Sequence, residues 1–248
     1  MGTSKSYKAT ISGQPQWGNL SGAVTRSCTG TKVPEKNLKN ILSKFTKVVG
    51  GSKKAGRGNS KVAGRSGARA AGNLGRFLGG FSSSGGNLVD TLQSLGLNNL
   101  VGKPAEDIIN NLIEYCSGVS NTIDDKAAKE ATRKLMEEMT SGAKTFDELE
   151  TNLKTALDKD SLQETIIRYF GYYILEHLSV MFYEKLVRDK GKTECSKLFK
   201  EIKDFIQSRL KEINRTYPIQ NIDWASAEAT KTIKNIQEDV LKVFEDED

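Results

Sequence analysis

The sequence predicts an all-α fold, in which a helical domain follows a flexible N-terminal tail and a basic, glycine-rich helical segment. Apolar residues recur at helical spacing along most of the chain. Two stretches match the capping box, a signature of helix starts, and helical apolar spacing follows each of them. Strict apolar/polar alternation does not run long enough to indicate a sheet. We expect three parts: 1–33, 34–86 and 87–248.

Residues 1–33 are expected to form the tail, because they are rich in Gly, Ser and Thr and their apolar residues are scattered. Trp17 is the exception, and we expect this aromatic side chain to dock onto another part of the molecule or onto a partner. Residues 34–49 are predicted to be helical: proline is favoured in a first turn, and Pro34 is followed by an apolar stripe of Leu38, Ile41, Leu42 and Phe45.

Residues 50–86 contain twelve glycines but are periodic. Small residues recur every four positions, and basic residues do so as well, which would give a small-residue face and a basic ridge on a helix. Glycine disfavours a helix by about 1 kcal/mol per residue relative to alanine. We therefore expect this segment to be ordered only by packing or by a partner. The small residues are Gly67, Ala71, Gly75 and Gly79, and the basic ones are Arg57, Lys61, Arg65 and Arg69.

The third part is predicted to be uniformly helical. One helix follows Pro104, and capping boxes at 145–148 and 161–164 open two more. Amphipathic stripes continue to Phe244. Residues 166–187 are the most apolar stretch, but charged residues interrupt them too often for a membrane span, so we expect a central core helix and no transmembrane segment.

Charge is distributed unevenly along the chain. Residues 1–89 carry fifteen Lys or Arg and a single acid, Glu35, whereas residues 90–248 carry twenty-two bases and thirty acids. Only the basic part has the net positive charge to attract an anionic partner. We predict nucleic-acid or partner binding within residues 53–76. Two other interpretations of this segment stay open: it is a solvated linker, or it docks on an acidic surface of the same chain or of a partner. The candidate residues are Arg57, Lys61, Arg65, Arg69 and Arg76.

The sequence predicts no catalytic residue, no metal site and no cofactor. His177, the single histidine, lies in the most apolar helix, where a hydrogen-bonded structural role is the favoured interpretation. The three cysteines are widely spaced and lack metal-binding spacing. Residues 51–58 have the glycine frame of a phosphate-binding loop, but Arg57 and Gly58 stand where Lys and Ser/Thr are required.

Two further features indicate a compartment. An odd number of scattered cysteines argues against a disulfide framework and fits a reducing environment. The start of the chain lacks a basic region followed by an apolar one, so secretion is not expected. We expect a cytoplasmic protein.

The opening residues MGTSKS admit two interpretations. They fit the myristoylation pattern, with Gly2 and Ser6 in the required places, and Lys5 and Lys8 could add attraction to an anionic membrane. In that case the protein would be a membrane-associated adaptor. Alternatively, Gly2, exposed by removal of Met1, could offer its amine for another modification.

A resemblance favours the second interpretation. Met1-Gly2-Thr3-Ser4, Ser6-Tyr7, Trp17 and the segment at 62–81 are similar to those of the QatB proteins of bacterial QatABCD anti-phage systems. The resemblance implies an operon with an ATPase, a QueC-like enzyme and a TatD-like nuclease. It further implies that the QueC-like enzyme uses ATP to join a 7-deazaguanine carboxylate to an amine.

On this resemblance, Gly2 is the expected conjugation site, with Thr3 and Ser4 as candidates for recognition by the modifying enzyme. The chain itself would then be no enzyme. A membrane-anchored adaptor and a general nucleic-acid-binding module remain the two alternatives.

Overall fold

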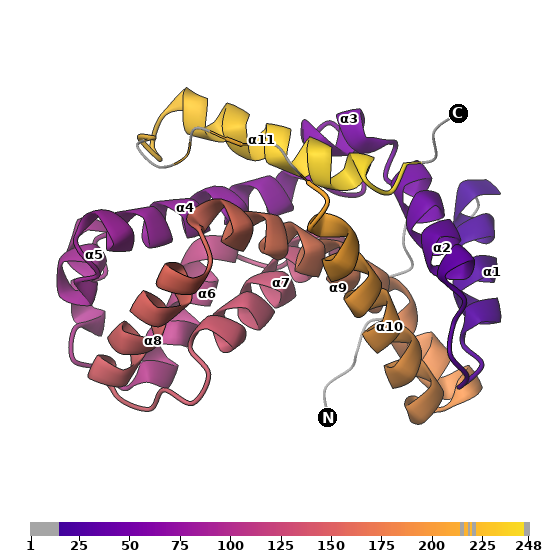
Figure 1. Ribbon diagram of the computed structural model, residues 1–248, viewed down its shortest axis with the longest axis horizontal. Helices are drawn as coiled ribbons and strands as arrows, with labels where there is room; N and C mark the ends of the chain where they lie inside the picture. Colours follow the sequence, from indigo (N-terminus) through magenta and orange to yellow (C-terminus); the bar gives the residue numbers. More distant parts are fainter. Residues whose placement is uncertain (1–14, 214–215, 218, 220–221, 246–248) are drawn as a thin grey trace.

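A computed structural model describes residues 15–213, 216–217, 219 and 222–245. Within these residues the chain consists of α-helices and one short 3-10 helix, with no strand, which confirms the all-α prediction (Figure 1). The elements are α1 (Pro15–Ser27), α2 (Glu35–Val48), α3 (Ser52–Gly56), α4 (Arg65–Ser83), α5 (Leu88–Ser94), η1 (Asn98–Leu100), α6 (Ala105–Ser117), α7 (Ile123–Met139), α8 (Phe146–Lys159), α9 (Leu162–Lys190), α10 (Lys192–Leu210) and α11 (Ala227–Lys242).

Helix α9 is the centre of the fold, as predicted for residues 166–187. It contacts α1, α4, α7, α10 and α11. A helix covered on several sides must be apolar around its circumference, and α9 buries an almost unbroken run from Thr165 to Leu178. The aromatic residues of this run pack in the core, with Tyr169 and Tyr173 fully enclosed.

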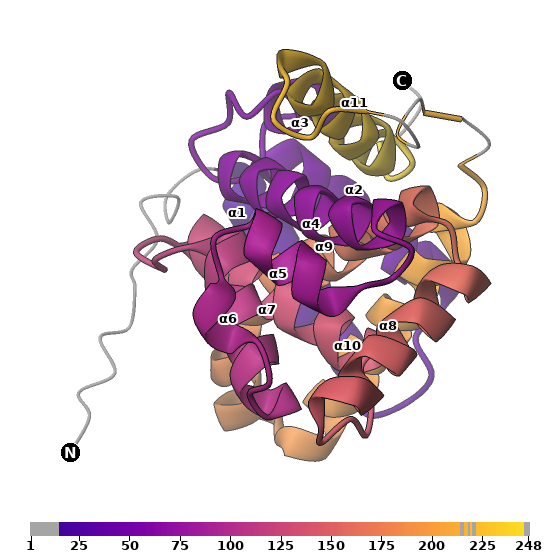
Figure 2. The same cartoon turned by 90° about the vertical axis from the view of Figure 1, so that its left-hand side faces the viewer.

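The other helices form two groups around α9. In Figure 1, α4–α8 lie toward the N-terminal end of α9 and α1 and α2 toward its C-terminal end, while α10 packs back along α9. Helices α3 and α11 contact each other and cross above α4, and Figure 2 shows the same arrangement from the side. The buried apolar residues of all these helices belong to one continuous core.

Local hydrogen bonds define several helix starts. The capping boxes predicted at Thr145 and Ser161 are both present, each with its glutamate three residues later. A third box, which the sequence analysis missed, opens α7, where Thr122 and Asp125 cap each other. It escaped notice because aspartate replaces the usual glutamate or glutamine at the third helical position.

The predicted tail at 1–33 is wrong for its second half, because residues 15–27 form helix α1. Leu20, Ala23 and Val24 are buried, and this spacing places them on one face against the core. Trp17 stacks on Phe182 of α9, with ring centroids 5.1 Å apart, so the expected docking of this side chain is confirmed. Residues 1–14 lie outside the described part of the chain.

The glycine-rich segment is helical in two pieces rather than one. Helix α3 ends at Gly56 and α4 begins at Arg65, and the backbone between them has positive φ at Gly58 (+72°) and Gly64 (+107°). Positive φ is incompatible with a right-handed helix and is tolerated by glycine because it has no Cβ. A single basic ridge from Arg57 to Arg69 therefore does not exist.

Candidate functional site: a basic groove between α4 and α11

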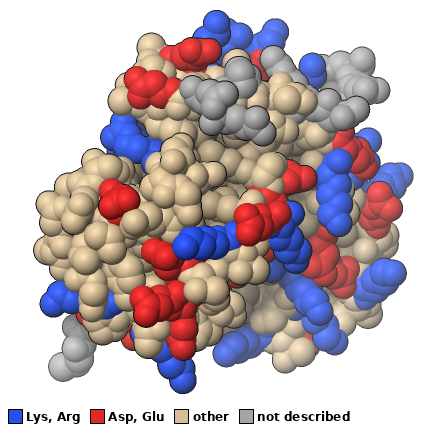
Figure 3. Space-filling view, turned by 60° about the vertical axis from the view of Figure 1, so that its left-hand side comes forward, with Lys and Arg blue, Asp and Glu red and all other residues tan. Residues whose placement is uncertain are grey.

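A groove of about 490 Å³ lies between α4, α11 and the segment that precedes α4. Among the described residues that line it, every charged side chain is basic. Figure 3 shows a face of the molecule on which acidic and basic side chains lie beside one another. Trp224, the polar residues Asn59, Asn73 and Thr230, and a few small or apolar residues complete the groove. The cations are Arg57, Arg65, Arg69, Arg76 and Lys234.

Helix α4 supplies three of these cations from one face. At 100° per residue, positions four and eleven residues after Arg65 return to nearly the same direction. Arg65, Arg69 and Arg76 therefore point toward the same side of α4, and all three are exposed. Of the ridge predicted from the sequence, Arg65 and Arg69 lie on this face, and Arg76, predicted separately as a binding residue, joins them.

The small residues of α4 accommodate two aromatic side chains. A Cβ on Gly67 would collide with the ring of Tyr173, and a Cβ on Gly75 or Gly79 would overlap the indole of Trp224. The atoms nearest Gly75 belong to the six-membered ring and those nearest Gly79 to the five-membered ring. The indole thus lies along α4 across both glycines, which fixes one wall of the groove.

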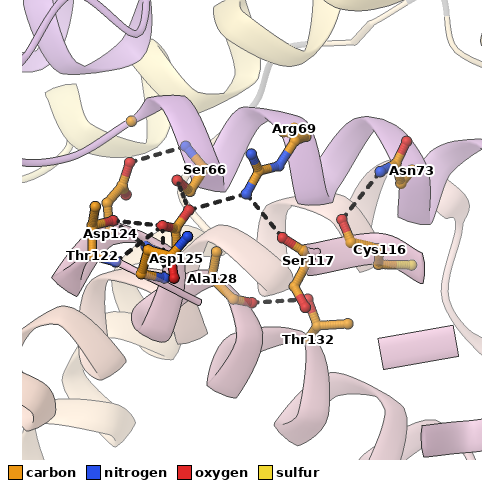
Figure 4. A network of polar contacts seen from close by, with 12 residues as sticks. Ser66, Arg69, Asn73, Cys116, Ser117, Thr122, Asp124, Asp125, Ala128 and Thr132 are labelled. Atoms are coloured by element: carbon orange, nitrogen blue, oxygen red, sulfur yellow. Dashed lines mark hydrogen bonds and ion pairs between the residues drawn. The ribbon is translucent and has the colours of Figure 1, made fainter. Parts of the chain in front are cut away.

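Two carboxylates from α7 hold the first turn of α4 (Figure 4). The backbone N–H of Ser66 donates to Asp124 Oδ2 at 2.9 Å, and its hydroxyl donates to Asp125 Oδ1 at 2.7 Å. Gly64 N–H donates to the Tyr173 hydroxyl at 2.6 Å, and this hydroxyl donates to Asp124. Two of the N–H groups that a helix start leaves free are thereby paired, and the position of α4 is tied to α7 and α9.

Asp124 is held ionised by its partners. Burial acts to raise its pKa, but hydrogen bonds from His177, Tyr173 and Ser66 N–H lower it, and the net pKa is about 2. Asp125 likewise has a lowered pKa: burial opposes the shift, while Ser66 and Thr122 hydrogen bonds drive it. Both groups therefore present negative charge to the start of α4, where the helix dipole is positive.

The cations of the groove differ in how they are paired. Arg69 Nη2 donates to Asp125 Oδ1 at 3.0 Å and to the Ser117 carbonyl at 2.9 Å, so this side chain fastens α4 to α7 and to the end of α6. Arg57 pairs with Glu238 at 3.4 Å. Within the described residues, no carboxylate pairs with Arg65, Arg76 or Lys234. Arg76 Nη2 donates to the Trp224 carbonyl at 3.5 Å but contacts no carboxylate of the described residues. We call these three residues the unpaired cations, meaning that none forms an ion pair within the described part of the chain.

Two reactive side chains outside the groove lining, His177 and Cys116, are buried. His177 is fully buried, with Nε2 3.2 Å from Asp124 Oδ1, in the hydrogen-bonded structural role favoured by the sequence. Cys116 is buried, and burial raises the pKa of its thiol. In the part of the chain that the structure describes, no group of His, Cys, Asp and Glu could hold a metal ion, and no helix is long and apolar enough to cross a membrane.

Comparison with protein-family models identifies the family of the chain. A family model described as "Qat anti-phage system associated protein QatB" matches residues 50–244. The chain belongs to the QatB family. It is accordingly a component of an anti-phage defence system. The matched range runs from before α3 to beyond α11 and so includes the whole groove. No curated protein and no solved structure matches the chain.

The predicted site residues of this QatB-family chain differ in where the structure places them. Arg57, Arg65, Arg69 and Arg76 meet in the groove, whereas Lys61 is exposed in the segment before α4 and is absent from the lining. Gly2, Thr3 and Ser4 lie outside the described residues, so their predicted roles stay predictions.

Sequence reasoning missed Lys234 and Trp224 as groove residues. Both lie about 150 positions beyond the arginines, in or just before α11, and reach the groove only because α11 packs on α4. The glycines at 75 and 79 signalled a close contact, but the sequence did not say with which side chain.

Proposed function

We propose that this QatB-family protein is a non-enzymatic subunit of its defence system, and that its Gly2 amine is conjugated to a 7-deazaguanine by a QueC-like, ATP-dependent enzyme. The observation that supports the proposal is the Met1-Gly2-Thr3-Ser4 opening on a chain of this family. Thr3 and Ser4 would be read by the modifying enzyme. The ATPase and the TatD-like nuclease of the system, all in the cytoplasm, are the other proposed partners.

The chemistry of glycine suits this role. ATP activates the 7-deazaguanine carboxylate, the neutral Gly2 amine attacks the activated carbonyl carbon, and an amide forms as the activating group leaves with the carboxylate oxygen. An α-amine has a pKa near 8, so a useful fraction is neutral at pH 7. Glycine has no side chain to hinder the approach of the amine to an enclosed active site.

The basic groove supports a second part of the proposal, which is contact with an anionic partner. Its three unpaired cations form no ion pair with the protein's own carboxylates among the described residues, in contrast to Arg69. A cluster of such charges attracts polyanions and raises their association rate. The partner is either nucleic acid or an acidic surface of another subunit.

The test is the intact mass of the protein, coexpressed with its gene neighbours, followed by sequencing of the N-terminal peptide. A deazapurine amide on Gly2 is the expected result. Gly2→Val should abolish the modification, because a β-branched residue crowds the amine. Ser6→Ala is the matched control: it removes the hydroxyl that the myristoylation pattern requires and leaves the glycine intact.

Each other outcome selects a rival. An acyl group on Gly2 that is lost in Ser6→Ala would identify a myristoylated, membrane-associated adaptor. A bare Gly2 in the coexpressed protein would reject conjugation and leave the groove as the basis for a nucleic-acid-binding module. Phage protection by Gly2→Val equal to that of wild type would also contradict the proposal.

A further inference from the structure

The unpaired cations of the groove are spaced for an extended anion. Arg65 and Arg76 are eleven residues apart on α4, which corresponds to about 16 Å along the helix axis. Lys234 stands on the opposite wall, on α11. Charges on two facing walls over this length suit several phosphate groups in a row better than one small anion.

The shape of the site favours a single strand over a duplex. The groove encloses about 490 Å³ between two helices and has charged walls. This volume holds a nucleotide-sized group, whereas a duplex is far wider and could touch only the rims. Arg57 and Glu238 form an ion pair at one end of the groove, where the structure supplies its own anion.

Trp224 gives the groove an aromatic surface. The indole lies across Gly75 and Gly79 of α4 and remains partly exposed within the lining. Aromatic side chains beside a basic track are the usual platform for unpaired bases, and stacking of each base contributes about 1–3 kcal/mol. Ala68, which is partly exposed, extends this surface. An acidic peptide has no need of it.

We propose that the groove between α4 and α11 binds single-stranded nucleic acid, with phosphates at Arg65, Arg76 and Lys234 and one base against Trp224. The inference deepens the groove part of the proposed function by naming the class of its partner. It is independent of the fate of Gly2. Arg69, because it is paired with Asp125, positions α4 and contributes less to binding.

The first experiment measures binding of a fluorescent 15-nucleotide single strand by anisotropy over a range of salt concentrations. The triple variant Arg65→Gln/Arg76→Gln/Lys234→Gln should lower the affinity at least tenfold. The slope of log affinity against log salt should fall by about two, since each phosphate contact on a single strand contributes about 0.7. The matched control, Lys39→Gln/Lys185→Gln/Lys200→Gln, removes the same charge from exposed positions outside the groove.

Circular dichroism of both triple variants confirms that the helices are intact. Equal losses in the two triple variants would reduce the binding to net charge and overturn the assignment of the groove. Duplex of the same sequence that binds as tightly as the single strand would overturn the class of ligand. Polyglutamate that displaces the strand at equal charge concentration would favour an acidic protein partner instead.

A second measurement tests the aromatic contact. The chain has two tryptophans, so Trp17→Phe leaves Trp224 as the single indole. Its fluorescence should be quenched on addition of the single strand, and Gly2→Val should show the same quenching because the groove does not depend on Gly2. Unchanged Trp224 emission at saturating strand would contradict the base contact. Quenching without conjugation of Gly2 would separate failure of the proposed modification from failure of this inference.

Discussion

Two hollows of the same volume, about 490 Å³, differ in what their charges do. The basic groove lies between α4 and α11. The second hollow, lined by residues of α7, α9 and α10, contains Arg168, which donates to Glu138 at 2.8 Å and to Asp160 at 2.6 Å. Lys134 in the same hollow pairs with Glu176 at 3.4 Å. Equal space thus accompanies different use of charge: the second hollow pairs two of its three cations with carboxylates and holds the third, Lys203, over the Tyr172 ring at 5.3 Å, whereas the groove leaves three of its five cations without a carboxylate among the described residues.

The comparison also applies within α4. Arg65 and Arg69 are one turn apart and alike in sequence, yet Arg69 is tied to Asp125 while Arg65 is not. The difference arises from the neighbouring helix, since the start of α7 brings the Asp125 carboxylate to Arg69. Pairing, rather than the mere presence of arginine, separates a structural residue from a candidate binding residue.

The largest expected effect comes from breaking the wall of the groove. Gly75→Ala places a methyl group into the indole of Trp224, which lies directly on α4. Because overpacking forces ring or backbone shifts, we expect the free energy of unfolding to fall by about 3 kcal/mol. Urea denaturation measures it. A loss below about 0.5 kcal/mol would mean that Trp224 does not pack on Gly75.

The next effect concerns the anchor of α4. Asp124 has a pKa of about 2 in the folded protein, below its ordinary value of 3.8, so its ionised form stabilises the fold. This contribution, about 2 kcal/mol, is present above pH 4 and lost as the pH falls from 4 to 2. Asp124→Asn should therefore destabilise the protein at pH 7 and matter little near pH 2.

Denaturant unfolding at several pH values tests this dependence. Asp90→Asn serves as the control, because Asp90 is exposed at the start of α5. Asp90→Asn should change the free energy of unfolding only slightly at every pH. An Asp124→Asn difference that stays constant from pH 7 to pH 2 would contradict the electrostatic role of Asp124.

A smaller effect sharpens the contrast between the two hollows. Arg168→Gln leaves Glu138 and Asp160 without their charged donor, and we expect a loss of about 1.5 kcal/mol in unfolding free energy. Arg65→Gln should change it by less than about 0.5 kcal/mol, since surface residues without such partners contribute little. The affinity for the single strand should fall more in Arg65→Gln than in Arg168→Gln. Equal stability losses in the two variants would remove the distinction drawn between paired and unpaired cations.

The sequence predicted much of this fold but only one wall of the site. Helical spacing gave the central helix α9, and capping boxes placed Thr145 and Ser161 because such signals act within one turn. The arginines of α4 were likewise visible as a local period. Lys234 and Trp224 were not, because their place in the groove depends on packing between segments about 150 residues apart. Helix α1 was missed because glycine and serine around Leu20 and Val24 obscured a short apolar face.

The smallest expected effect is a gain. Gly72 lies on the groove side of α4, and a Cβ there would meet no atom within 4 Å among the described residues. Alanine is favoured over glycine in a helix by about 1 kcal/mol, so Gly72→Ala should raise the free energy of unfolding by up to that amount. Urea denaturation alongside Gly75→Ala measures both signs in one helix, three residues apart. A loss in both variants would mean that α4 tolerates no side chain on either face. A gain in Gly72→Ala with a loss in Gly75→Ala would show that glycine serves the Trp224 contact at one position and costs helix stability at the other.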